Sequence, residues 1–99
     1  MFRENALYHR KLEITDHLMS VFAEISGDRH RLHIDQEFAM CRRFKNRVAY
    51  GNLLGLMISS LVGMELATEN VILISQKINY HEPFYPGDSI DLHAEISKI

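Results

Sequence analysis

The stretch from residue 48 to residue 64 carries no charged side chain, and its apolar residues have helical spacing. They are Leu53, Leu54, Met57, Ile58, Leu61 and Val62. A helix over roughly 50–65 is therefore apolar on most of its circumference and must be covered by other elements. At about 1.5 Å per residue the uncharged stretch spans about 25 Å, shorter than the ~30 Å core of a membrane. We predict a buried central helix rather than a membrane span.

Small residues recur every four positions along this helix, namely Gly51, Gly55, Ser59 and Gly63. Such a stripe lets another backbone approach closely, either in a helix-on-sheet contact or in a membrane helix dimer. We favour packing of the helix against a sheet.

Three segments show the two-residue period of strands. Leu12 and Ile14 alternate with polar residues, residues 71–80 place apolar side chains on one face, and residues 90–97 alternate throughout. Pro86-Gly87-Asp88 marks a turn between the last two segments. The predicted order, in a single domain over residues 1–99, is strand, helices, strand, strand. Three strands cover the central helix poorly, so we expect a second subunit to help complete the core.

Two shorter helices are predicted before the central one. Thr15 or Asp16 can cap the first, and Gly27 can end it in a left-handed conformation. Its apolar residues are Leu18, Val21, Phe22 and Ile25. Asp35 is the expected cap of the second, in which Cys41 is expected to be a small buried side chain.

The charge of the chain excludes some partners. Eleven basic and 13 acidic residues give a net charge of −2, which argues against a protein that coats nucleic acid or an anionic membrane. Six of the basic residues nevertheless lie between Arg29 and Arg47, and that stretch carries +4. With one cysteine and no basic-then-apolar leader, the sequence predicts a reducing, cytoplasmic location.

A carboxylate and an imidazole, Asp28 and His33, lie five residues apart in the loop after the first predicted helix. Loops held at both ends by regular structure often carry reactive groups. An Asp that caps local amides and an exposed His would also explain this pair. The spacing of His30, His33, Asp28 and Asp35 is too loose for a metal site, so none is predicted. His81 and His93 are expected on the surface.

One block of the sequence resembles the signature of the MaoC-like, R-specific enoyl-CoA hydratases (hydratase 2): Phe22-Ala23-x-x-Ser26-Gly27-Asp28-x-x-x-x-His33-x-Asp35-x-x-Phe38-Ala39. Two further matches follow in the same order, Arg47-Val48-Ala49-x-Gly51-x-Leu53 and Pro83 with Pro86-Gly87-Asp88. The resemblance spans roughly residues 12–96. It implies an α+β hotdog fold, in which an antiparallel sheet wraps around a long central helix, here without the last strands of the sheet. Two explanations stay open: the domain is truncated at its C-terminus, or another chain supplies the missing edge.

The resemblance also implies roles for individual residues. Asp28 and His33 match the catalytic pair that holds the water added to, or removed from, the β-carbon of an acyl thioester. Gly51 matches the glycine whose amide binds the thioester carbonyl at the start of the central helix. The side chains expected to contact the substrate are Tyr50, Leu53, Leu54 and Ser59, with residues 53–58 lining an acyl tunnel.

Two positions differ from the family pattern. His30-Arg31 stands where Asn-Pro is usual, and Tyr50 stands where a histidine is common. Because Asn-Pro makes this loop rigid, the sequence leaves open what holds the catalytic pair in place. Tyr50 is expected to reshape the site beside the thioester.

The implied activity is that of a hydro-lyase, the reversible hydration of a trans-2-enoyl thioester to the R-3-hydroxyacyl thioester. This chemistry needs a base for the water, a proton for Cα and a donor for the enolate-like oxygen. We expect His33 to be the base. No separate cofactor is expected, because coenzyme A or phosphopantetheine is part of the substrate. The expected assembly is a homodimer or a larger homo-oligomer, without nucleic acid or membrane.

The basic residues Arg43, Lys45 and Arg47 are typical of a solvated loop. They can also meet the phosphates of coenzyme A or the acidic helix of an acyl carrier protein. The sequence leaves two other functions open. One is a hotdog acyl thioesterase that uses the same helix terminus, and the other is a non-catalytic subunit that binds acyl groups or supports assembly.

Overall fold

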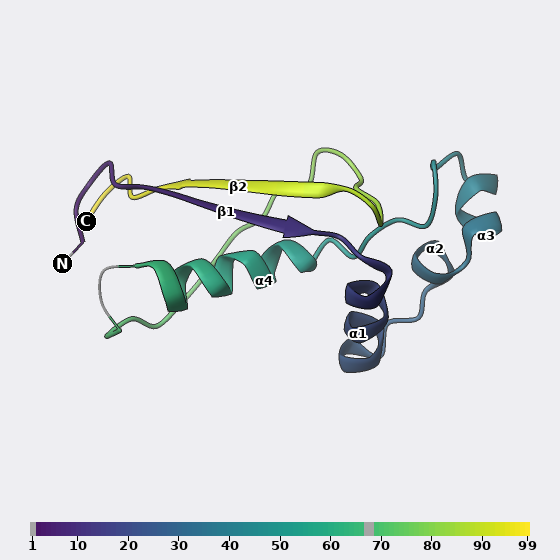
Figure 1. Ribbon diagram of the computed structural model, residues 1–99, viewed down its shortest axis with the longest axis horizontal. Helices are drawn as coiled ribbons and strands as arrows, with labels where there is room; N and C mark the ends of the chain where they lie inside the picture. The colour runs from purple at the N-terminus through teal and green to yellow at the C-terminus, as the bar shows by residue number, and fades with distance from the viewer. Residues whose placement is uncertain (1, 67–68) are drawn as a thin grey trace.

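The computed structural model describes residues 2–66 and 69–99. Two strands, β1 (Leu7–Glu13) and β2 (Ser89–Glu95), form an antiparallel sheet with α4 (Leu53–Ser60) lying along it (Figure 1). Three further helices, α1 (Asp16–Ser26), α2 (Arg31–Ile34) and α3 (Gln36–Cys41), lie at the end of the molecule where β1 finishes. The predicted antiparallel sheet and central helix are confirmed.

The register of the sheet runs from Leu7 opposite Glu95 to Glu13 opposite Ser89. Side chains alternate between exposed and half-buried along both strands, as expected where one face of a sheet is covered. On the covered face, Arg10 donates to the Ser60 hydroxyl at the end of α4 and forms an ion pair with Glu65. These contacts fix the helix against β1.

The strand predicted over residues 71–80 is wrong, because this segment forms no strand. A strand needs backbone partners, and within the described residues β1 and β2 pair only with each other, so no strand is paired with this segment. Ile72 and Ile74 of the predicted apolar face are 82% and 90% exposed, so this half of the face lies in solvent.

Helix α1 has the predicted ends. The Thr15 hydroxyl accepts a hydrogen bond from the Leu18 N–H at 3.0 Å, and Gly27 closes the helix with φ 76°. The last apolar residue of the pattern, Ile25, is 81% exposed, because it lies beyond the part of α1 that contacts the core.

Helix α3 begins as predicted, since the Asp35 carboxylate accepts from the Phe38 N–H at 3.1 Å. The same bond is the main reason why the pKa of Asp35 is lowered, with an added contribution from Arg31. Cys41 is exposed, so the prediction that it is buried is wrong. In this short helix only Ala39 is buried, and the other side chains face outward or lie half-buried.

The central helix starts later than predicted. Residues 50–52 form a tight first turn, in which the carbonyls of Tyr50, Gly51 and Asn52 each accept from the N–H three residues ahead. Regular α-helix begins at Leu53, and a π-helical turn over Leu61–Glu65 follows it. In the described part of the chain, each helix falls short of the length and apolarity that a membrane crossing requires.

The main core lies where β1, α1 and the start of α4 meet. Its buried members are Ile14, Met19, Ala23, Ala49, Tyr50 and Leu53. The predicted turn joins this core, because the Gly87 N–H donates to the Ile14 carbonyl at 2.7 Å and Gly87 has φ 99°. The core therefore fixes the segment just before α4 against the loop after α1, and both carry predicted site residues.

Candidate active site

The loop after α1 holds Asp28 through its own hydrogen bonds. The Asp28 N–H donates to the Ser26 hydroxyl at 3.0 Å, and the Asp28 carboxylate accepts from the His30 N–H at 3.0 Å through Oδ1. The second carboxylate oxygen, Oδ2, remains available on the side that faces His33.

His33 lies on α2 rather than in an open loop, and its ring has one fixed partner. Its Nδ1 is 2.7 Å from the Val48 carbonyl oxygen. A carbonyl only accepts, so this contact requires the proton on Nδ1 and leaves Nε2 of the neutral ring with a free lone pair. The Val48 N–H also donates to the Leu32 carbonyl at 2.8 Å, which fixes the backbone that orients the ring.

The structure brings the predicted pair together. His33 Nε2 and Asp28 Oδ2 are 3.9 Å apart, which is too long for a direct hydrogen bond. A water molecule about 2.8 Å from each atom can bond to both of them. The two side chains are therefore spaced to share one water.

Tyr50 packs beneath this pair. It is 2% exposed, and its ring stacks on the His33 ring with centroids 4.1 Å apart. Its hydroxyl donates to the Asp28 carbonyl at 2.6 Å. Burial raises the pKa of Tyr50, the Asp28 charge raises it further, and Arg29 and Arg47 act in the opposite direction. Tyr50 thus contacts both His33 and Asp28 from its buried position in the core, whereas the sequence predicted a contact between Tyr50 and the substrate.

The two residues that replace Asn-Pro also fit the loop. His30 caps α2, because its ring Nδ1 accepts from the Leu32 N–H at 3.1 Å. An asparagine side chain commonly makes this kind of cap. Arg31 occupies the first helical position, where proline is favoured, and its ion pair with Asp35 bridges one helical turn. In this chain, these contacts hold the loop after α1 in place of Asn-Pro.

Gly51 and His33 line one cavity of about 230 Å³, together with Val48, Ala49, Tyr80, Glu82, Pro83 and Phe84. Within the described chain no carbonyl accepts from the Gly51 N–H. A Cβ at Gly51 would lie 3.0 Å from the Tyr80 ring, whose hydroxyl donates to the Asn52 side chain at 3.2 Å. The sequence pattern missed Tyr80 and Phe84 as cavity residues. The pattern of residues 71–80 predicts a strand face for Tyr80, and only Pro83, next to Phe84, belongs to the family motif.

Three residues expected beside the substrate lie outside this cavity. Leu53 is fully buried in the core, Leu54 is half-buried, and Ser59 is exposed near the end of α4. Their proposed contacts with an acyl chain remain predictions.

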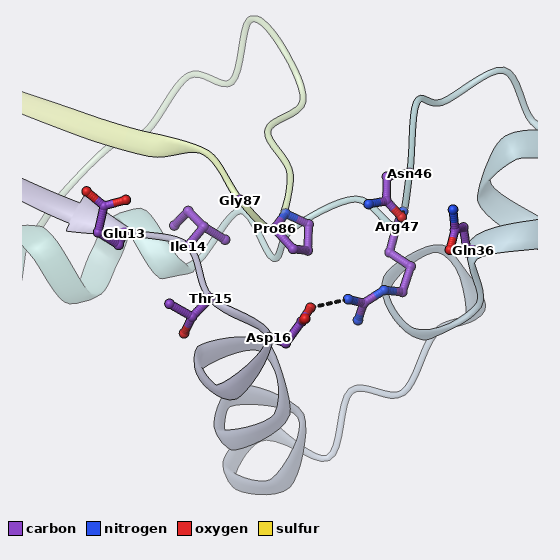
Figure 2. A pocket seen from close by; sticks show the side chains of 9 residues that line it. All are labelled: Glu13, Ile14, Thr15, Asp16, Gln36, Asn46, Arg47, Pro86 and Gly87. Carbon is purple, nitrogen blue, oxygen red and sulfur yellow. Dashed lines mark hydrogen bonds and ion pairs between the residues drawn. The ribbon is translucent and has the colours of Figure 1, made fainter.

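The three basic residues expected to meet phosphates, Arg43, Lys45 and Arg47, do not line one common cavity. Arg47 forms an ion pair with Asp16 at the edge of a larger cavity of about 470 Å³, between the end of β1, the start of α1 and the Pro86-Gly87 turn (Figure 2). Arg43 and Lys45 are exposed and line neither this cavity nor the one at His33. The described residues contain no group of three or more His, Cys, Asp or Glu side chains that could hold a metal ion.

Comparison with known proteins agrees with this geometry. A 3-hydroxybutyryl-CoA dehydratase of Methylorubrum extorquens is 33% identical over 89 residues, which cover 90% of this chain and 57% of that protein. A mitochondrial 3-hydroxyacyl-[acyl-carrier-protein] dehydratase of Arabidopsis thaliana is 31% identical over 72 residues, 73% of this chain and 42% of that protein. The chain thus spans about half the length of these two relatives.

The fold has a counterpart of known structure. The R-hydratase PhaJ1 of Pseudomonas aeruginosa superposes with a TM-score of 0.88 at 27% identity, over 98% of this chain and 63% of that one. The predicted hotdog fold is confirmed, and the described residues contribute its central helix and two strands. The sequence model of the family described as "MaoC like domain" matches residues 3–99. With nearly its whole length matched, and with the motif residues Asp28 and His33 facing each other, this chain belongs to the MaoC-like domain family.

Proposed function

We propose that this protein hydrates 2-enoyl thioesters reversibly to R-3-hydroxyacyl thioesters. The observation that carries the proposal is the fixed tautomer of His33. Its Nδ1–H donates to the Val48 carbonyl, so the Nε2 lone pair faces Asp28 Oδ2 across 3.9 Å. The names of the M. extorquens and A. thaliana relatives, both dehydratases of 3-hydroxyacyl thioesters, support the same chemistry.

In the proposed reaction, one water binds between His33 and Asp28. As its oxygen bonds to Cβ, Nε2 of His33 takes a water proton and the C=C electrons move toward the thioester carbonyl. A proton from the same pair then bonds to Cα and completes the addition. General acid–base assistance of this kind typically contributes about 10²–10⁴-fold.

The Gly51 N–H is the proposed donor to the carbonyl oxygen that gains charge during this step. It has no acceptor in the described chain, and it lines the same cavity as His33. One amide donor aimed at a developing oxyanion is typically worth about 3–4 kcal/mol. Glycine at this position leaves room for the Tyr80 ring, so Gly51 and Tyr80 together border the cavity that a thioester would enter.

We also propose the form of the substrate, the cellular location and the assembly of the protein. The substrate is an acyl group on coenzyme A or on acyl carrier protein, and it supplies the only prosthetic group. The protein works in the cytoplasm as a homodimer or a larger homo-oligomer.

The test uses crotonyl-CoA and follows two signals, the loss of enoyl absorbance and the release of free thiol. We expect absorbance loss without thiol, and a decrease of about 10²–10⁴-fold in kcat for Asp28→Asn. The amide of Asn can still accept from the His30 N–H, so the loop is retained. Asp91→Asn, an exposed change on the sheet, is the matched control and should leave kcat unchanged.

Two results would contradict the proposal. Thiol release without hydration would identify a thioesterase. Absence of turnover in the wild-type protein, with unchanged acyl-CoA binding in Asp28→Asn and His33→Ala, would identify a non-catalytic acyl-binding subunit.

A further inference from the structure

Two arginines lie over one aromatic ring on the surface formed by α2 and α3. The guanidinium carbon of Arg42 is 3.5 Å from the centroid of the Phe38 ring, and that of Arg31 is 4.3 Å from it. Stacking on an aromatic ring orients a guanidinium group and leaves its N–H edges free for a partner. We call Arg31, Phe38 and Arg42 the α2–α3 platform.

One of the two arginines of the platform has no acidic partner among the described residues. Arg31 shares one contact with Asp35 at 3.2 Å, but no carboxylate of the described residues lies within ion-pair distance of Arg42. Arg29 and Arg43 are exposed nearby in sequence, and residues 29–47 carry +4 while the rest of the chain carries −6. Positive charge is therefore concentrated on one part of an otherwise acidic protein.

The platform is also next to the candidate active site. Arg31 and His33 lie on the same helical turn, α2, and Figure 1 shows α2 and α3 at one end of the molecule, beyond the sheet. A partner bound there would be close to the His33 cavity without covering α4. Arg31, Phe38 and Arg42 do not line the five cavities of the described residues whose lining is defined, the His33 cavity included. A small ligand is normally held in a concave pocket, whereas an open charged surface fits the surface of another protein.

We propose that the α2–α3 platform docks an acidic carrier protein, which delivers the acyl thioester to His33 on its phosphopantetheine arm. This inference rests on the proposed hydratase function and names the form of its substrate. Carboxylates on the carrier pair with the free N–H edges of Arg42 and Arg31, and the arm then reaches the cavity that contains His33 and Gly51. The name of the A. thaliana relative, an acyl-carrier-protein dehydratase, agrees with such a substrate.

The test compares crotonyl groups on acyl carrier protein and on coenzyme A. We expect Arg42→Glu to reduce kcat/KM for the carrier-bound substrate about tenfold, since reversing an interface charge mainly slows association. The value for crotonyl-CoA should be unchanged. Lys77→Glu makes the same charge change on the exposed segment after the central helix and should affect neither substrate. Circular dichroism of each variant checks that the fold is retained.

Direct binding separates this inference from the catalytic proposal. Calorimetry with holo carrier protein, without an acyl group, should show binding that weakens with salt and is lost in Arg42→Glu. Equal losses with both substrates, or unchanged carrier binding by Arg42→Glu, would overturn the docking proposal. If wild-type protein binds the carrier through Arg42 but does not hydrate crotonyl-CoA or the carrier-bound substrate, docking stands and the hydratase proposal fails.

Discussion

The Tyr50 hydroxyl offers the sharpest test of how the catalytic pair is positioned. Tyr50→Phe keeps the ring stacked between His33 and Phe22, whose centroids lie 4.1 Å and 4.5 Å away, and removes the hydrogen bond to the Asp28 carbonyl. A buried acceptor left without its donor costs about 1–3 kcal/mol. Because Asp28 is exposed, its carbonyl can regain water, and we expect the lower end, about 1 kcal/mol.

For a domain of this size, about 1 kcal/mol lowers the Tm by about 4–8 °C. We also expect kcat to fall about tenfold with KM unchanged, because Asp28 loses the contact that fixes it relative to His33 Nε2, and small displacements of reacting groups are costly. Thermal unfolding by circular dichroism and crotonyl-CoA hydration measure the two effects. Tyr8→Phe on β1 is the control, and it should leave kcat unchanged.

Tyr50 should also affect how the stability of the protein changes at alkaline pH. Its pKa is raised above 10.0 by burial, so the folded protein holds this proton at a pH where the unfolded chain has lost it. The stabilisation is complete below about pH 10 and is lost as pH rises through the folded-state pKa. Wild type should therefore lose more stability than Tyr50→Phe above pH 10. A Tyr50→Phe protein with wild-type kcat and the same alkaline unfolding would refute the assigned role of the hydroxyl.

Three further predictions concern single contacts. Gly51→Ala places a Cβ 3.0 Å from the Tyr80 ring, so we expect it to lower the free energy of unfolding by about 1 kcal/mol. Adding Tyr80→Ala removes the crowding ring and should largely relieve this loss, which a double-mutant cycle measures. Thr15→Ala removes the cap of α1 and should cost about 1 kcal/mol, whereas Thr15→Ser should be nearly neutral in urea unfolding. The pKa of Asp35 is lowered by the Phe38 N–H bond and by Arg31. The Asp35 carboxylate therefore stabilises the folded protein above pH 3.8, and this contribution is lost as pH falls through the folded-state pKa of Asp35. Asp35→Asn should flatten the acid side of the Tm profile, and an unchanged profile would contradict this assignment.

Local sequence signals predicted the parts of the fold that depend on neighbouring residues. Thr15 and Gly27 set the ends of α1, and the alternation around Leu12 and after Ile90 gave both observed strands. The segment containing Ile74 has the same alternation, but it forms no strand because pairing depends on a partner that its own residues do not specify. Periodicity reports which face is apolar and not what covers that face.

The sequence likewise predicted only part of the candidate site. The motif placed Asp28 and His33 five residues apart, and the structure shows them facing each other. The carbonyl of Val48, which sets the tautomer of His33, could not be read from the sequence because any residue type supplies a carbonyl. The position of Tyr50 beneath the pair was also missed, since its burial arises from packing of α1 against the start of α4.

The exposed segment at residues 71–80 has a consequence for handling the protein in solution. Ile72 and Ile74 face solvent, and β-branched residues with unpaired backbone groups readily add to the edge of another sheet. We expect self-association through this stretch to rise with concentration and to compete with correct refolding. Dilute refolding and a soluble fusion partner would therefore give the best yield of the chain.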